Sequence, residues 1–172
     1  MDVRSPKTVT KDTDLDTFIR DNSDDALEIV KQILPTCGEY LLVDRVLEEG
    51  PNTLSAQWSV PEDGPWFRTD GAGQKLLLPG TVTTEHLIQA GEILIYRERG
   101  GRPEDDGVPV LARIRSARYR AMVKPGDVLT SELRLTETVG AAYYVTGIVK
   151  VGAQTVLKAE LTFTATNAIS VQ

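Results

Sequence analysis

The segment 76–96, LLLPGTVTTEHLIQAGEILIY, constrains the fold more than any other part of the chain. The Pro79-Gly80 pair introduces a long apolar run, and we predict a helix that continues to about Arg99. Such a helix is too apolar to leave one side in water, so the rest of the chain has to cover most of its surface.

The same helix carries polar groups along one side. Glu85, Gln89 and Glu92 follow one another at helical spacing, and His86, the only histidine of the chain, adjoins Glu85. A charged group on a mostly buried helix is costly and therefore needs a reason. Consecutive helical residues point about 100° apart, so Glu85 and His86 do not face each other within one chain.

The segments around the helix favour β-structure. We predict strands at 39–50 and 52–64, joined by a Gly-Pro-Asn turn, and a loop from Pro61 to Gln74. A solvent loop at 100–107 precedes a β-meander, with turn signals at Pro125-Gly126, Gly140 and Gly152. An antiparallel sheet with one long helix on a single face is an α+β fold.

The ends of the chain differ in character. Residues 1–13 form a polar tail without periodicity, and short helices are predicted at 14–22 and 23–35. No repeat or linker divides the remainder, so 14–172 is predicted to be one domain.

Composition excludes several function classes. A net charge of −6 argues against general nucleic-acid binding. The single cysteine excludes an internal disulfide, and with a single histidine we predict no metal site and no cofactor. No run approaches the roughly 20 apolar residues of a membrane span, and a signal segment is absent, so a cytoplasmic location is expected.

Residues 107–124, GVPVLARIRSARYRAMVK, are basic and contain no acidic residue. The arginines change from odd to even positions, which predicts a β-bulge near Ser116 and Ala117. The run is either a solvated strand face or a docking surface for an acidic partner.

Three stretches together resemble one family. LPTCGEYLLVDRVLE (34–48), LPGTVTTEHLIQAGEIL (78–94) and IRSARYRAMVKPGD (114–127) are similar, in this order, to motifs of the (3R)-hydroxyacyl-acyl-carrier-protein dehydratases of the FabZ and FabA type. The resemblance implies a hot-dog fold, in which an antiparallel sheet wraps one long central helix. It also implies an acyl-thioester substrate on acyl carrier protein or CoA, and a homodimer or higher homo-oligomer.

The resemblance implies roles for three helix residues. Glu85 matches the catalytic acid, Gln89 the glutamine that orients it, and Gly80 the glycine whose backbone N–H polarises the thioester carbonyl. The loop histidine of the family is missing, and Gly71 stands at its position. We therefore count Gly71 among the expected substrate-binding residues. Asp70 is therefore a candidate base, and His86 a candidate substrate-binding residue near the pocket of another subunit.

The expected function is a divergent 3-hydroxyacyl-acyl-carrier-protein dehydratase or isomerase of fatty-acid or polyketide-type metabolism. A hot-dog acyl thioesterase is one alternative, and a non-catalytic acyl-binding or scaffolding subunit is another. One face of the basic strand is expected to face the core, so only one of its arginine pairs is expected to stay solvated. For docking of the acidic carrier protein we select Arg118, Arg120 and Lys124, where the basic run approaches the turn at Pro125-Gly126.

Overall fold

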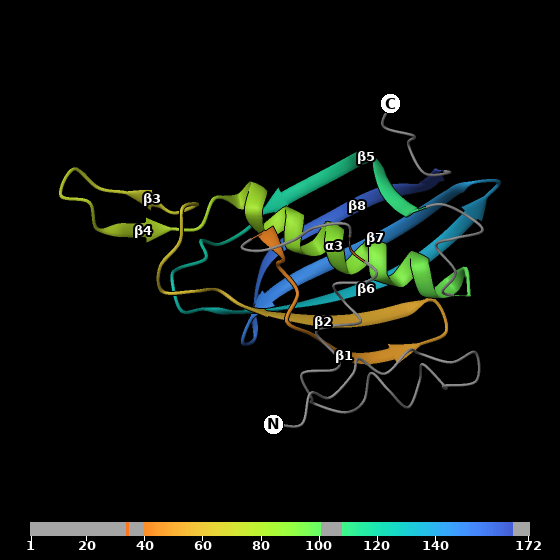
Figure 1. The fold of residues 1–172 in the computed structure, drawn as a ribbon, viewed down its shortest axis with the longest axis horizontal. Helices are drawn as coiled ribbons and strands as arrows, with labels where there is room; N and C mark the ends of the chain where they lie inside the picture. The colour runs from red at the N-terminus through yellow and green to blue at the C-terminus, as the bar shows by residue number, and fades with distance from the viewer. Residues whose placement is uncertain (1–33, 35–39, 101–107, 167–172) are drawn as a thin grey trace, which may run out of the picture.

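The computed structural model describes residue 34 and residues 40–100 and 108–166. One long helix, α3 (Gly80–Glu98), lies across a six-stranded antiparallel sheet (Figure 1). In sheet order the strands are β1 (Arg45–Gly50), β2 (Thr53–Ser59), β6 (Val128–Val139), β7 (Ala142–Val151), β8 (Gln154–Thr166) and β5 (Val108–Tyr119). The predicted α+β arrangement is therefore observed, with the meander of 108–166 forming four of these strands.

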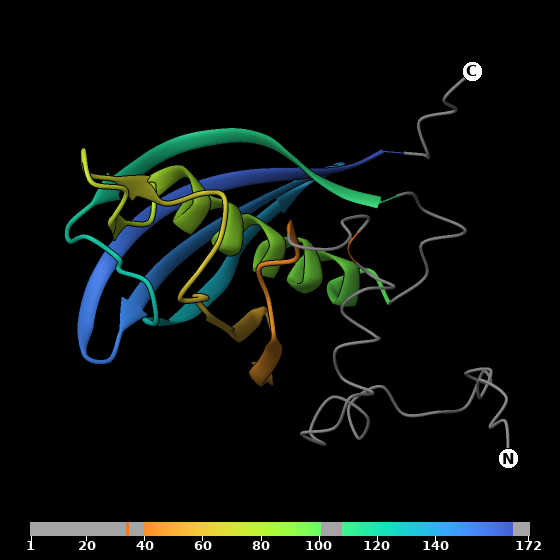
Figure 2. The same cartoon turned by 60° about the vertical axis from the view of Figure 1, so that its left-hand side comes forward.

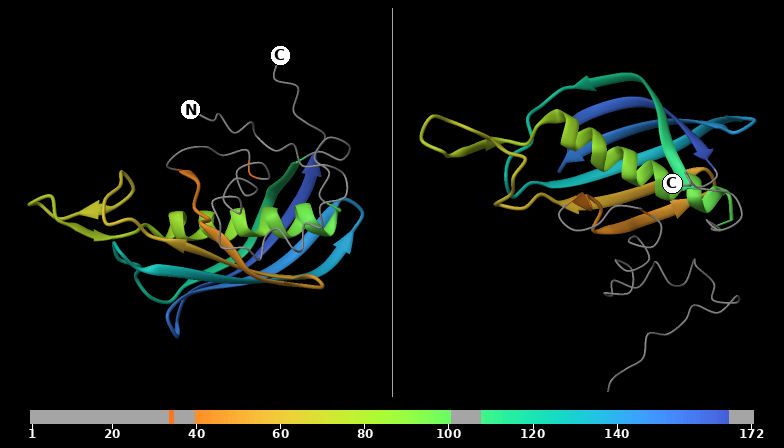
Figure 3. Two further views of the ribbon diagram at one scale, coloured as in Figure 1. Left: turned by 60° about the horizontal axis from the view of Figure 1, so that its bottom comes forward. Right: turned by 45° about the horizontal axis from the view of Figure 1, so that its top comes forward.

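The sheet curves around α3, so that the helix lies in its concave side (Figures 2 and 3). Side chains alternate across each strand, and in β2 the residues Leu54, Ala56 and Trp58 point inward and are buried. The helix lies directly on β8 because Gly91 has no side chain. A Cβ at this position would stand 2.4 Å from the ring of Phe163.

The limits of α3 agree with those predicted from the sequence. Pro79 occupies the N-cap position, and the helix ends at Glu98, where Arg99 and the positive φ of Gly100 redirect the chain. Eleven of its 19 residues are buried, which explains why the segment is apolar almost all round.

Three predicted segments differ from the structure. Both strands predicted before the helix are shorter, because regular pairing of β1 begins at Arg45 rather than near residue 39, and β2 ends at Ser59 rather than at residue 64. The stretch predicted as loop contains a small hairpin of β3 (Arg68–Thr69) and β4 (Lys75–Leu77), which forms a separate two-stranded sheet. Its strands are too short for the alternating pattern that identifies a strand in a sequence.

The bulge predicted in the basic strand is confirmed. Pairing of β5 with β8 shifts between Ile114 and Ser116, one residue before the predicted position, and again between Leu111 and Arg113. The turns predicted at Gly140 and Gly152 are confirmed as well, and both glycines have positive φ.

The predicted tail, the two helices at 14–22 and 23–35, and most of the 100–107 loop lie outside the described residues. No helix among the described residues is long and apolar enough to cross a membrane.

Candidate functional site

The polar side of α3 forms a stripe in which Glu85, Gln89 and Glu92 succeed one another over two turns. Gln89 is fully buried, whereas Glu85 and Glu92 are partly buried. The Gln89 Nε2 group donates a hydrogen bond to Glu85 Oε1 at 3.2 Å. The structure thus brings Gln89 into direct contact with the Glu85 carboxylate, and its role in a catalytic site stays a prediction.

Gln89 also holds the chain that precedes β1. Its Nε2 donates to the Tyr40 carbonyl at 2.9 Å, and its Oε1 accepts from the Leu42 N–H at 2.8 Å. Both amide hydrogens and the amide oxygen are therefore used, as a buried polar side chain requires. Residues 40–44 are held partly by side chains of α3, since regular pairing with β2 begins only at Arg45.

His86 contributes to the same attachment from the next helical position. Its Nδ1 lies 2.6 Å from the Leu42 carbonyl, so Nδ1 carries the proton and donates. The ring is fully buried and stacks on Trp58 with centroids 6.2 Å apart, and Nε2 has no hydrogen-bond partner among the described residues. Burial lowers the pKa of His86 to about 4, against the smaller opposing effects of the Leu42 carbonyl and Asp44. These contacts favour a packing role over substrate binding.

The negative charge of Glu85 acts on two neighbouring groups. Burial, and then the negative charge of Glu85, raise the pKa of Glu92 to about 8. Burial and Glu85 also raise the pKa of the Tyr40 phenol. Sequence reasoning placed Glu92 on the stripe but assigned it no role, because its environment depends on contacts that helical spacing does not show.

The start of α3 lines a separate pocket of about 320 Å³ that includes Gly80, Tyr119 and Met122. A Cβ on Gly80 would stand 2.7 Å from the Tyr119 ring, so only glycine lets this ring cover the helix start. The Tyr119 hydroxyl lies 2.8 Å from Thr84 Oγ1, which in turn donates to the Gly80 carbonyl at 3.0 Å. The first N–H groups of a helix lack helical acceptors and lie at its positive end, where an oxyanion is stabilised. Glu85 does not line this pocket within one chain.

Asp70 and Gly71 lie in the turn between β3 and β4, which projects beyond the start of α3 (Figure 1). Asp70 Oδ1 accepts hydrogen bonds from the backbone N–H groups of Ala72 at 2.9 Å and Gln74 at 2.8 Å. Asp70 therefore shapes the turn, and both residues are exposed. Among the described residues no contact joins either of them to Glu85, so the site roles of Asp70 and Gly71 stay predictions.

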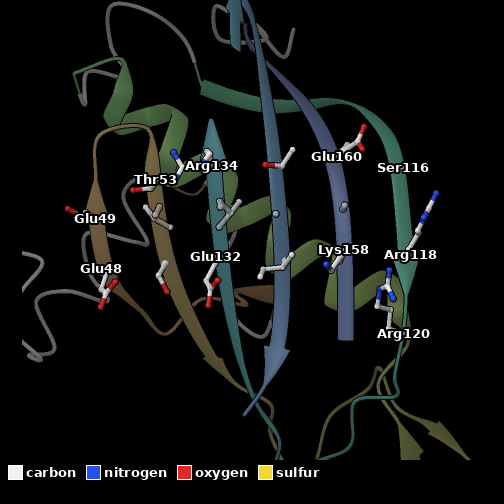
Figure 4. A pocket seen from close by; sticks show the side chains of 17 residues that line it. Glu48, Glu49, Thr53, Ser116, Arg118, Arg120, Glu132, Arg134, Lys158 and Glu160 are labelled. Atoms are coloured by element: carbon white, nitrogen blue, oxygen red, sulfur yellow. The ribbon is translucent and has the colours of Figure 1, made fainter. Parts of the chain in front are cut away.

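Two residues of the basic run lie on the face of the sheet opposite α3 (Figure 4). Arg118 and Arg120 line a shallow groove of about 770 Å³ together with Lys158, while Glu48 and Glu132 lie toward its other end. No salt bridge engages these three cations in the described part of the chain, whereas Glu132 pairs with Lys150 at 2.6 Å.

The third residue selected for docking, Lys124, is exposed beyond the end of β5 and does not line the groove. Its backbone N–H donates to Asp127 Oδ2 at 2.7 Å, which stabilises the turn. Tyr119 lines the pocket at Gly80, whereas Arg118 and Arg120, its neighbours in the chain, point to the opposite face of the sheet. The two arginines therefore lie directly behind that pocket.

Within 40–100 and 108–166, no group of three or more histidine, cysteine or carboxylate side chains is arranged to hold a metal ion.

Comparison with known proteins gives a consistent result. A family model for the FabA-like domain matches residues 34–160. The 3-hydroxyacyl-[acyl-carrier-protein] dehydratase FabZ of Anaeromyxobacter sp. (strain K) is 34% identical over 132 residues, which are 76% of this chain and 84% of the relative.

Solved structures share the architecture. One chain of the dehydratase heterocomplex ApeI:P from Xenorhabdus doucetiae matches with a TM-score of 0.65 and 21% identity, covering 80% of this chain and 91% of the other. Zebra fish thioesterase superfamily member 2 matches with a TM-score of 0.60 and 17% identity, over 83% and 97% of the two chains. These likenesses confirm the predicted hot-dog fold.

Proposed function

We propose, because this chain belongs to the FabA-like domain family, that it dehydrates a 3-hydroxyacyl thioester presented by acyl carrier protein or CoA. The observation that carries the proposal is the Glu85 carboxylate, held on the partly buried stripe of α3 by the fully buried Gln89. A carboxylate positioned by a buried amide that also fixes the neighbouring backbone is an oriented group suited to proton transfer.

Dehydration removes a proton from the carbon next to the thioester carbonyl and releases the 3-hydroxyl group as water. It therefore requires a proton-transferring group, such as Glu85, and a donor for the negative charge that develops on the carbonyl oxygen. The backbone N–H of Gly80 is the candidate donor, because it lies at the positive end of α3 in a pocket.

A homodimer is part of the proposal. In one chain the Gly80 pocket contains no carboxylate, and the Glu85 carboxylate does not line it. We infer that the Gly80 pocket of one copy meets the Glu85 of the other across paired helices. This can be tested by mixing Glu85→Gln chains with Gly80→Ala chains, in which the new methyl group displaces the Tyr119 ring into the pocket. Each variant alone is then impaired, and mixed dimers regain one complete site. Recovery that never exceeds the sum of the two variants contradicts a shared site.

The function itself is tested by following formation of 2-enoyl thioester from a 3-hydroxyacyl thioester. Wild type is compared with Glu85→Gln and with the matched control Glu137→Gln, which changes an exposed carboxylate on β6. We expect loss of turnover only in Glu85→Gln. Equal rates in wild type and Glu85→Gln would exclude Glu85 as the acting group.

A thioesterase is the second candidate. One observation favours it: the described site offers a carboxylate and a helix-start amide, while the only histidine of the chain is buried on the Leu42 carbonyl. A carboxylate can direct water at a thioester without an imidazole. Release of free thiol from acyl-CoA distinguishes the two reactions, because dehydration leaves the thioester intact. Ligand-induced stabilisation without either reaction would indicate a non-catalytic acyl-binding subunit.

A further inference from the structure

The face of the sheet opposite α3 carries charged side chains in an order that the proposed function does not use. The groove of about 770 Å³ runs across this face, so the side chains of one chain leave it hollow (Figure 4). Its charged residues lie on the strands at both sides of β7, in two neighbouring rows that follow from the pairing register. The signs of the charges in these rows indicate what fits the groove.

Charges of the same sign are grouped along the first row. From β1 to β5 this row consists of Glu48, Ser55, Glu132, Ile148, Lys158 and Arg118. Two acids therefore stand on one side of the half-buried Ile148 and two bases on the other. Arg118 is the direct cross-strand partner of Lys158, and like charges in this arrangement repel each other. Glu132 pairs with Lys150, whereas no hydrogen bond or ion pair engages the side chains of Lys158 and Arg118 within the described residues.

The second row has the opposite polarity. Arg134 on β6 and Glu160 on β8 flank Thr146 of β7, so base and acid have exchanged sides relative to the first row. Both charged side chains are exposed, and neither has an ion-pair partner in the described part of the chain. An acidic partner would attract Lys158 but would be repelled by Glu132 and Glu160. A fitting partner has to present two rows whose polarities are likewise opposed.

We propose that this face binds the same face of a second copy of the chain, about a two-fold axis that runs along β7. Such an axis places β6 of each copy over β8 of the other. Glu132 then faces Lys158 of the second copy, and Arg134 faces Glu160 of the second copy. Each pair occurs twice by symmetry, and Ile148 meets its own counterpart at the axis. The strands of the two sheets run in similar directions, as in aligned sheet packing.

This contact is separate from the helix pairing proposed above, because α3 lies on the other side of the sheet (Figure 2). It therefore joins two helix-paired dimers into a four-chain assembly. The sheet is convex on this side, so the central strands meet first and the buried area is small. Charged side chains that cross the hollow supply much of the attraction. We therefore expect a weak association that decreases with rising salt concentration.

The first test places one thiol on the proposed axis. Thr146 is exposed on β7, and Thr146→Cys in a Cys37→Ser chain brings two thiols of neighbouring copies within reach of a short bis-maleimide. At low salt and micromolar protein concentration we expect about tenfold more covalent dimer than from the control Gln154→Cys, which is exposed at the start of β8 and distant from the axis. High salt should reduce the crosslink of Thr146→Cys.

An exchange of charges identifies the contacts. Arg134→Glu alone, or Glu160→Arg alone, sets like charges against each other twice, and should raise the dissociation constant of the salt-sensitive association by about tenfold or more in sedimentation velocity. The double variant Arg134→Glu/Glu160→Arg restores opposite charges and should return to within about threefold of wild type. This recovery separates a lost contact from a lost fold. The control Glu62→Arg, at an exposed loop carboxylate, should have no effect.

Two results overturn the inference: a Thr146→Cys crosslink no stronger than that of Gln154→Cys, or a double variant as impaired as the single ones. The first result, combined with slower maleimide labelling of the introduced thiol when acyl carrier protein is added, would assign the face to that acidic protein instead. No substrate enters these measurements, so the dehydratase proposal stands or fails independently of them.

Discussion

Replacing Gln89 by methionine tests the contact network on which the site depends. The change keeps the length of the side chain and removes all three hydrogen bonds, to Leu42 N–H, the Tyr40 carbonyl and Glu85. Leu42 is fully buried, so its N–H loses its partner without gaining water, which costs about 1–3 kcal/mol. The Tyr40 and Glu85 partners are more exposed and regain water, so each adds about 0.5–1.5 kcal/mol. The expected loss of unfolding free energy is therefore about 2–6 kcal/mol.

The assay is urea unfolding, with the exposed Gln154→Met on β8 as the matched control. The control is expected to stay within about 0.5 kcal/mol of wild type. Gln89→Met should also lose turnover of a 3-hydroxyacyl thioester, because the Glu85 carboxylate loses the donor that orients it. An unfolding free energy within about 0.5 kcal/mol of wild type would refute the view that Gln89 fastens residues 40–42 to α3.

Gln89→Glu refines the same test. A carboxylate still accepts from Leu42 N–H, but it faces the Tyr40 carbonyl and Glu85 with lone pairs instead of donors. When protonated, it recovers one donor. Its stability deficit should therefore shrink on acidification from pH 8 to pH 5, and a deficit independent of pH would contradict this reasoning.

Three further predictions follow from other parts of the structure. The pKa of His86 in the folded state is lowered from 6.5 to about 4, so its contribution to the free energy of unfolding is complete above pH 6.5 and decreases by about 3 kcal/mol as pH falls toward 4. His86→Gln should therefore weaken the loss of stability between pH 6.5 and 4 when unfolding is measured as a function of pH. An unchanged loss of stability in this variant would assign the effect to other groups. Gly91→Ala places a methyl group within 2.4 Å of the Phe163 ring and should destabilise the protein by about 3 kcal/mol or more in thermal unfolding. The control Gly71→Ala, whose methyl group meets open space, should be nearly neutral. Similar melting temperatures for the two variants would contradict the close packing of α3 on β8. Replacing Arg118, Arg120 and Lys124 by serine should slow association with acyl-carrier substrates at low salt but leave turnover of a small neutral thioester unchanged. If the triple variant associates as fast as wild type at low salt, the carrier protein docks elsewhere.

The helix and the irregular edge strand could be predicted because each leaves a local pattern. Pro79 and a long apolar run mark the limits of α3, and the change of phase among the arginines marks the bulge beside Ser116. The β3–β4 hairpin leaves no such pattern, since its strands have two and three residues and depend on pairing alone. One expectation about the basic run was wrong. Only one arginine pair was expected to stay solvated, yet all four are exposed, because β5 is an edge strand.

The site was predictable only as far as one helix shows it. Helical spacing placed Glu85, Gln89 and Glu92 on one side and separated His86 from Glu85, as the structure does. It could not reveal that Gln89 and His86 bind the backbone of residues 40–42, because those contacts join positions more than 40 residues apart. Nor could it reveal the state of Glu92, which depends on burial.

The contacts explain why an apolar helix carries these polar residues. Gln89 and His86 form hydrogen bonds with backbone groups of Tyr40 and Leu42, before β1. These bonds take the place of strand pairing, which begins only further along the chain. Glu92 has no such structural partner in the described chain, and burial keeps it protonated instead. Gln89 and His86 therefore attach the chain to α3, whereas Glu85, which accepts a hydrogen bond from Gln89, is the carboxylate on which the proposed dehydration depends.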